Sequence, residues 1–130
     1  MTRILIVEDS PTMRAMLVAA LEDLGPAVKI TEAESGFEAL RRLPRETYDL
    51  ILTDINMPDI NGLELVAFVK KNEAYSSIPL VIVSTEGSER DRDKGLALGA
   101  DAYLVKPFDP EALRRIVQDL LDRGARRAAD

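Results

Sequence analysis

The residues best suited to chemistry in this chain are polar residues that end apolar runs of the sequence. Five residues share this position: Glu8, Asp9, Asp54, Ser84 and Lys106. Keeping three neighbouring carboxylates ionised costs free energy unless a cation lies among them. An all-oxygen set of ligands favours a hard ion, and magnesium binds through one or two carboxylates together with waters and phosphate oxygens. The pattern therefore indicates a magnesium site, provided that the fold brings these residues together.

The composition excludes several other kinds of site. The 130 residues include no Cys and no His, which excludes disulfides, thiolate chemistry, Ser-His triads and a phosphohistidine on this chain. The net charge of −6 argues against a nucleic-acid binder, which would be basic. No apolar run approaches the roughly 20 residues that span a bilayer, and the start "MTRILIVEDS" has no signal-peptide pattern. We expect a cytoplasmic protein that contacts neither nucleic acid nor membrane.

The apolar runs predict five strands, and helical patterns alternate with them. The strands are expected over residues 3–7, 27–33, 49–54, 78–84 and 101–106. Capping patterns predict the starts of four helices: Ser10-Pro11, Ser35 with Glu38, Asn61 with Glu64, and Asp109-Pro110. A further helix is expected over 88–99, although its first half offers few apolar residues. Residues 124–130 lack periodicity and are expected to form a short frayed tail after a domain of residues 1–123.

Strict alternation of strands and helices is typical of an α/β fold with a parallel sheet. The second strand alternates apolar and polar residues, which predicts a position at the edge of the sheet. Parallel strands deliver their last residues to one edge of the sheet, and ligands of open α/β sheets bind there. The polar residues that end the strands are therefore expected to meet in one crevice.

The segments around these residues resemble the response-regulator receiver domains of two-component signalling. The resemblance covers residues 3–121 and is carried by "VEDS", "LTDINMPDINGLEL", "VIVSTEG" and "GADAYLVKPF". The sequences of these motifs are most similar to those of stand-alone, chemotaxis-type (CheY-like) regulators. The resemblance implies a flavodoxin-like, doubly wound (βα)5 three-layer sandwich whose five-stranded parallel sheet has the order 2-1-3-4-5.

The resemblance also implies that Asp54 accepts a phosphoryl group from a histidine on a partner histidine kinase. Asp9, Asp54 and the backbone carbonyl of Asn56 are then expected to bind Mg²⁺, with Glu8 holding the ion through a water. Mn²⁺ is expected to substitute for magnesium. A divalent cation suits this role because it neutralises the oxygens of the group in transfer.

Other residues acquire roles through the same resemblance. Lys106 is implied to pair with one phosphoryl oxygen as a compact point charge, and the Ser84 hydroxyl to bond another. Tyr103 is implied to turn inward when Ser84 moves, so that the two act as a switch. Asn56 and Glu86 are implied to tune dephosphorylation, and the peptide bond between Lys106 and Pro107 is implied to be cis.

On this interpretation the chain is a single-domain response regulator, expected to be a monomer and to act in chemotaxis or motility. A downstream target protein is expected to dock on the face built from residues 88–121. The first turns of the helix over 88–99 offer little to the core, and weakly packed elements are the ones that switch. The chain is not expected to be an enzyme, because it would catalyse only its own phosphorylation and dephosphorylation.

Other classes of protein fit the residues less well. A haloacid-dehalogenase-like phosphatase needs a second carboxylate two residues after its nucleophile, and that position is Asn56. A calcium-binding EF-hand fails because Pro58 and Asp59 stand where an oxygen ligand and a glycine are required. A degenerate receiver that acts as a phosphorylation-independent interaction module remains the alternative.

Overall fold

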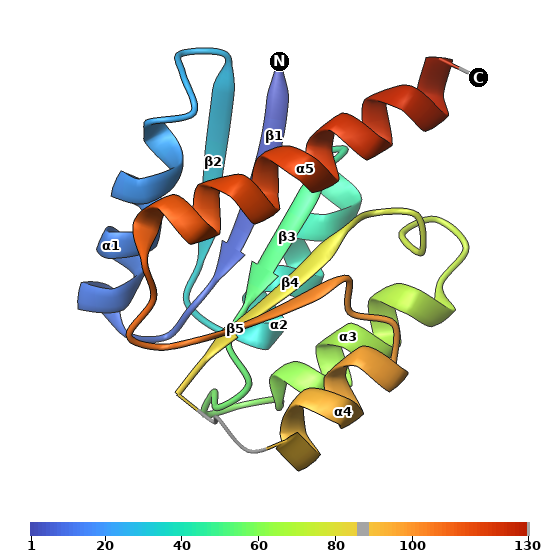
Figure 1. Ribbon diagram of the computed structural model, residues 1–130. Coiled ribbons are helices and arrows are strands. Elements are labelled where there is room, and N and C mark those ends of the chain that lie inside the picture. Colours follow the sequence, from blue (N-terminus) through green and yellow to red (C-terminus); the bar gives the residue numbers. More distant parts are fainter. Residues whose placement is uncertain (86–88, 130) are drawn as a thin grey trace.

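The computed structural model describes residues 1–85 and 89–129, and it places a parallel sheet between two layers of helices (Figure 1). The strands are β1 (Thr2–Val7), β2 (Val28–Ala33), β3 (Leu50–Thr53), β4 (Leu80–Ser84) and β5 (Ala102–Val105). The helices are α1 (Pro11–Glu22), α2 (Gly36–Arg42), α3 (Gly62–Lys71), α4 (Glu89–Ala97) and α5 (Pro110–Ala129), with a 3₁₀ turn, η1 (Leu43–Arg45). All strand pairs are parallel in the order β2-β1-β3-β4-β5, which confirms the predicted fold.

The pleat of the strands divides the apolar residues between two cores. Ile4 and Ile6 of β1 face the layer formed by α1 and α5, whereas Leu5 and Val7 face the layer formed by α2, α3 and α4. Successive side chains of a strand point to opposite faces, so a strand covered on both faces has to be apolar throughout. All four residues of β3 are buried for this reason. β2 lies at the edge of the sheet, as its alternating pattern predicts.

Four helices begin at the predicted capping residues, each of which accepts a backbone N–H of the first turn. The pairs are Met13 with Ser10, Glu38 with Ser35, Leu63 with Asn61, and Glu111 with Asp109. Such a cap satisfies a donor that the helix itself leaves unpaired, and it contributes about 1 kcal/mol. The caps fix where each helix starts, and therefore the length of each loop at the strand ends.

The last helix is longer than the sequence pattern predicts. The apolar stripe ends at Leu121, and α5 continues to Ala129, through most of the segment that was expected to form a short frayed tail. Arg and Ala are strong helix formers, and adding a residue to an existing helix costs far less than starting one. The extension projects beyond the sheet in Figure 1. No helix in the described part of the chain is both long and apolar enough to cross a membrane.

Candidate functional site

The carboxylates of three residues meet where the two central strands end. The residues are Glu8, Asp9 and Asp54, and each offers one oxygen within 4.8 Å of the others. The sheet register brings them together, because Val7 is opposite Thr53 and the Asp54 N–H donates to the Val7 carbonyl at 3.1 Å. Glu8 and Asp54 are buried, whereas Asp9 is exposed. The prediction of a shared carboxylate crevice is confirmed by this geometry.

Lys106 reaches the same crevice from the end of β5. Its Nζ lies 2.5 Å from Glu8 Oε1 and 3.4 Å from Asp54 Oδ2, and only 6% of its side chain is exposed. The Lys106 N–H donates to the Ser84 carbonyl at 2.8 Å, which ties the start of the next loop to β4. The peptide bond that follows, between Lys106 and Pro107, is cis. One buried ammonium therefore lies between two carboxylates that come from different strands.

The charges of the crevice do not balance. Burial raises the pKa of Glu8, and the hydrogen bonds from Lys106 and from the Ser10 N–H offset this only in part. The nearby Asp54 carboxylate raises that pKa further. The site holds three carboxylates and one ammonium. When all four groups are ionised, its net charge is two negative charges, which a divalent cation would neutralise. A divalent hard cation fits this donor set, because all the side-chain ligands are oxygens.

The loop after β3 holds Asp54 in place through its backbone. Asp54 Oδ1 accepts the Ile55 N–H at 2.7 Å, and the Thr53 hydroxyl donates to the Asp54 carbonyl at 3.0 Å. Gly62, at the start of α3, donates its N–H to the Ile55 carbonyl at 2.7 Å. A Cβ on Gly62 would lie 1.9 Å from the Asp54 carbonyl oxygen, so a side chain has no space there. Gly62 thus allows α3 to start against the backbone of Asp54.

Asp59 joins the same loop to α2, a role that the sequence pattern did not indicate. Its carboxylate accepts the N–H groups of Gly36 at 3.1 Å, Phe37 at 2.8 Å and Ile60 at 2.8 Å. Desolvation opposes ionisation of Asp59, but these backbone N–H donors outweigh it and lower the pKa of its carboxyl to about 2. The sequence did not predict this role of Asp59, because its partners on α2 lie more than twenty residues earlier in the chain.

A second polar contact that sequence reasoning missed comes from α1. Arg14 Nη1 donates to the backbone carbonyl of Glu8 at 2.9 Å, and Arg14 Nε pairs with Glu32 of β2 at 3.0 Å. Only 13% of the Arg14 side chain is exposed. Arg14 therefore fixes the turn after β1, which carries Glu8 and Asp9. No short motif predicts this contact.

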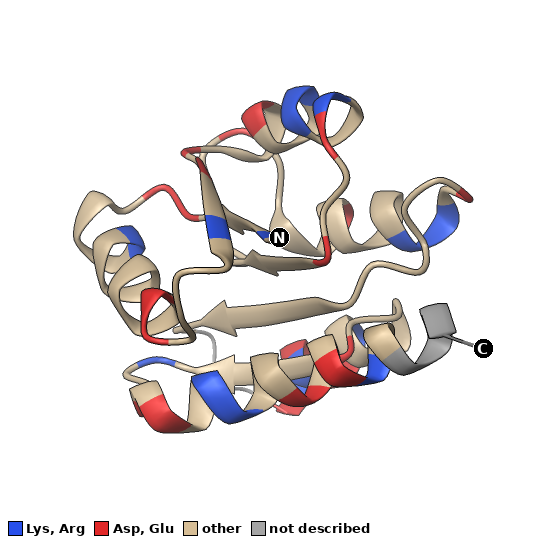
Figure 2. Ribbon diagram, turned by 90° about the horizontal axis from the view of Figure 1, so that it is seen from above, with Lys and Arg blue, Asp and Glu red and all other residues tan. Residues whose placement is uncertain are grey.

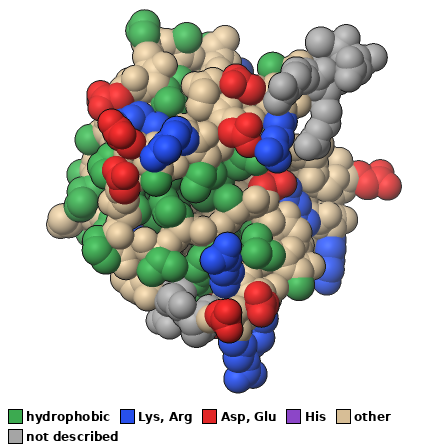
Figure 3. Space-filling model, in the orientation of Figure 1, with side chains coloured by type: hydrophobic (Ala, Val, Ile, Leu, Met, Phe, Trp, Pro, Cys, Tyr) green, Lys and Arg blue, Asp and Glu red, His purple; other side chains and the backbone are tan. Residues whose placement is uncertain are grey.

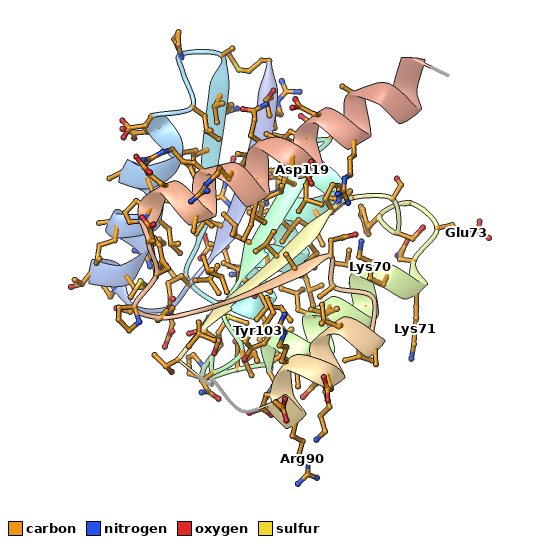
Figure 4. The ribbon with its side chains drawn as sticks, viewed as in Figure 1. Lys70, Lys71, Glu73, Arg90, Tyr103 and Asp119 are labelled. Carbon is orange, nitrogen blue, oxygen red and sulfur yellow. The ribbon has the colours of Figure 1, made fainter. Side chains whose placement is uncertain are left out.

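The remaining predicted residues are Ser84, Asn56, Tyr103 and Glu86. Ser84 is fully buried at the end of β4, and Asn56 is exposed two residues after Asp54. Tyr103 of β5 lies beside α4, and its ring is 3.6 Å from where a Cβ on Gly95 would lie (Figure 4). Glu86, expected to tune dephosphorylation, lies outside the described residues.

Comparison with known proteins places this site in a family. A model of the response regulator receiver domain matches residues 4–118. The chain is 39% identical to the chemotaxis protein CheY homolog of Campylobacter jejuni over 124 residues, or 95% of each chain. It is 36% identical to the chemotaxis protein CheY1 of Helicobacter pylori, over 92% of this chain and 96% of that one. This chain therefore belongs to the response regulator receiver domain family.

Solved structures agree in fold and in size. The chemotaxis response regulator CheY4 of Vibrio cholerae superposes with a TM-score of 0.83 at 36% identity, over 92% of this chain and 98% of that one. The receiver domain of a sensor histidine kinase from Pseudomonas aeruginosa has the same TM-score at 30% identity, over 93% of this chain and 98% of that one. That structure holds a magnesium ion coordinated in its active-site cleft.

Proposed function

We propose that the chain is a response regulator whose Asp54 accepts a phosphoryl group from a partner histidine kinase. The observation that carries this proposal is the buried Lys106 ammonium between Glu8 and Asp54, with a third carboxylate, Asp9, in contact. A structural ion pair needs one acid for one base, whereas this crevice has three acids. The excess negative charge is what a phosphoryl-transfer site needs to hold a divalent cation.

The residues of the crevice have separate tasks in the transfer. An Asp54 oxygen attacks the phosphorus as the bond to the donor nitrogen breaks, and the product is an acyl phosphate on Asp54. The Ile55 N–H holds the other end of this carboxylate in a fixed orientation. Lys106 balances charge on the new phosphoryl oxygens, because its ammonium already lies within reach of Asp54. The buried Ser84 hydroxyl hydrogen-bonds another phosphoryl oxygen.

Asp9, Asp54 and the Asn56 backbone carbonyl would hold a magnesium or manganese ion, and Glu8 would act on it through water. When bound, the ion supplies charge neutralisation of the transferring group. The donor set suits this ion, because the carboxylates already lie within one ligand sphere. Asn56 would also position the water that later hydrolyses the acyl phosphate, together with Glu86.

The signal would leave the molecule through the face made by α4, β5 and α5. Figure 3 shows apolar side chains gathered on this side of the molecule with charged side chains around them. Leu96 of α4 and Val105 of β5 are 39% and 43% exposed. We propose that a downstream target protein docks here once Ser84 and Tyr103 have shifted. The chain would act in the cytoplasm as a monomer, in chemotaxis or motility, with residues 1–123 as its receiver domain.

Incubation with acetyl phosphate tests the acceptor directly. Intact-mass measurement is expected to show one added phosphoryl group in the presence of magnesium or manganese, and none after chelation. The Asp54→Asn variant keeps the shape of the side chain but loses the nucleophile, so it is expected to remain unlabelled. Labelling of this variant to the same extent, or labelling that ignores the metal, would contradict the proposal. A phosphorylation-independent interaction module would take no label at all.

A further inference from the structure

Three hollows adjoin at the end of the sheet where the strands begin, opposite the carboxylate site. Their volumes are about 340, 700 and 620 Å³, and Glu46 lines all of them. The first and second share Arg45, and the second and third share Tyr75. The first borders β2 and the third borders the end of α5, so together they form a groove across this end of the molecule. We call it the basal groove.

One half of the basal groove is lined by cations, in a chain whose net charge is −6. Lys29, Arg42 and Arg45 line the first hollow, and Arg3 and Arg45 line the second. Among the described residues, Glu46 is the one carboxylate in either lining. Positive charge exceeds negative charge by three among the lining residues, and by two when Glu38, which pairs with Arg42 at 3.4 Å, is included.

The Glu46 carboxylate does not neutralise all the cations around it. Glu46 pairs with Lys29 at 2.8 Å. This hydrogen bond, with help from the charges of Arg3 and Arg42, lowers the pKa of the Glu46 carboxyl. Arg45 forms no ion pair within the part of the chain that the structure describes, and Arg3 Nε is buried without a hydrogen-bond partner there. Glu46 Oε2 is also buried without a hydrogen-bond partner in that part of the chain, so a carboxylate brought by a ligand would pair with Arg45 rather than relieve a general excess of donors.

The other half of the basal groove contains an apolar patch, with Glu46, Asp49 and hydroxyl side chains beside it. The third hollow is lined by Tyr75, Ile78, Pro79 and Leu121, among others. Beside the cationic half, β2 pairs with β1 alone among the described strands, so its outer edge is open. Open strand edges accept extended peptides through backbone hydrogen bonds. By contrast, charges of both signs alternate along α5 (Figure 2), so a cationic surface is not general to this molecule.

We propose that the basal groove binds an extended acidic segment of a partner protein, one whose glutamates or aspartates adjoin apolar residues. The carboxylates of that segment would pair with Lys29, Arg42 and Arg45, and its apolar residues would enter the hollow beside Tyr75. The ligand therefore needs an acidic part next to an apolar part, and the groove itself sets no chain direction. Because the groove lies at the opposite end of the strands from Asp54, a bound segment leaves phosphoryl transfer unobstructed.

A synthetic peptide in which a run of glutamates precedes a pair of leucines is the probe. Titration of the full chain, followed by amide NMR shifts, is expected to perturb residues 29–31, 42–46 and 75–78. Replacing Arg42 and Arg45 together by glutamate is expected to weaken binding about fivefold to thirtyfold, because each lost surface ion pair is worth about 0.5 to 1 kcal/mol. Arg90→Glu makes the same kind of charge change on α4, where the side chain points away from the body (Figure 4), and is expected to have no effect.

The controls separate this proposal from general attraction and from the phosphorylation site. A peptide with glutamines in place of glutamates, and one with serines in place of leucines, are both expected to bind more weakly. Asp54→Asn is expected to bind the probe like the wild type, so the basal groove and the proposed acceptor can fail independently. Equal weakening by Arg90→Glu, shifts confined to another face, or full displacement by inorganic phosphate alone would overturn the proposal. Thermal melts of every variant identify a loss of fold.

Discussion

The loop from Asp54 to Gly62 and helix α4 lie on the same side of the sheet, yet they are held very differently. The loop is fixed by backbone hydrogen bonds at Ile55 and Gly62 and by the three N–H groups that Asp59 accepts. Of the residues of α4, Gly95 alone is buried. The comparison teaches that this fold can hold the carboxylate site firmly while a neighbouring helix is packed only weakly.

The packing of α4 depends on this one glycine. A Cβ on Gly95 would lie 2.6 Å from Ile82 Cδ1 and 3.6 Å from Tyr103 Cδ2, so the helix backbone touches the sheet directly. The first turns carry acidic and basic residues, and they contribute little burial. Elements with few buried apolar contacts open at low free energy. On the proposed function, we therefore expect a small change at Ser84 or Tyr103 to displace α4 without disturbing the core.

The largest expected effect is at Gly62, in the tightly held loop. Gly62→Val would place side-chain atoms against the Asp54 carbonyl, and we expect a loss of about 3 kcal/mol in the free energy of unfolding. Urea denaturation measures this, with Gly124→Ala as the matched control. A Cβ on Gly124 meets nothing within 4 Å, so this helical change is expected to stabilise by up to about 1 kcal/mol. Equal changes in the free energy of unfolding for Gly62→Val and Gly124→Ala would contradict the claim that this loop is tightly held.

A smaller effect is expected at Asp59. Asp59→Asn keeps the shape but weakens the caps of α2 and of the loop, at a cost of about 1 kcal/mol near neutral pH. The folded pKa of about 2 lies below the ordinary value of 3.8. The stabilisation by Asp59 is therefore present above pH 4 and is lost as the pH falls towards 2. Unfolding measured from pH 5 to pH 2 should show the two proteins converging; a constant gap would show that the charge is irrelevant.

Gly62 and Asp59 also show which features of the molecule a sequence alone can predict. The strands and the carboxylate crevice were predictable, because apolar runs and strand-end residues are local features, whereas the strand order was implied only by the family resemblance. Gly62 could be taken only as a turn residue, since the clash that requires it involves the backbone of another element. Asp59 and Arg14 act on segments distant in the chain, and the helical length of α5 depends on propensity rather than on burial. Long-range contacts of this kind leave no local pattern.

The smallest expected effect is on α4. Asp93→Ala changes an exposed residue of a helix that buries little, and we expect its free energy of unfolding to stay within about 0.5 kcal/mol of the wild type. Urea denaturation in the same series as Gly62→Val provides the measurement. A loss as large as that of Asp59→Asn would mean that the surface of α4 is coupled to the core, and that the helix is not loosely held.

Hydrogen exchange with and without beryllofluoride tests the central claim, that a fixed carboxylate site controls a weakly packed helix. If Asp54 is the acceptor, as proposed, beryllofluoride and magnesium imitate its phosphoryl group. We predict that amides of α4 and β5 change their exchange rates, that the second half of α5 does not, and that Asp54→Asn shows no response. Unchanged exchange in α4, or the same response in Asp54→Asn, would contradict the account.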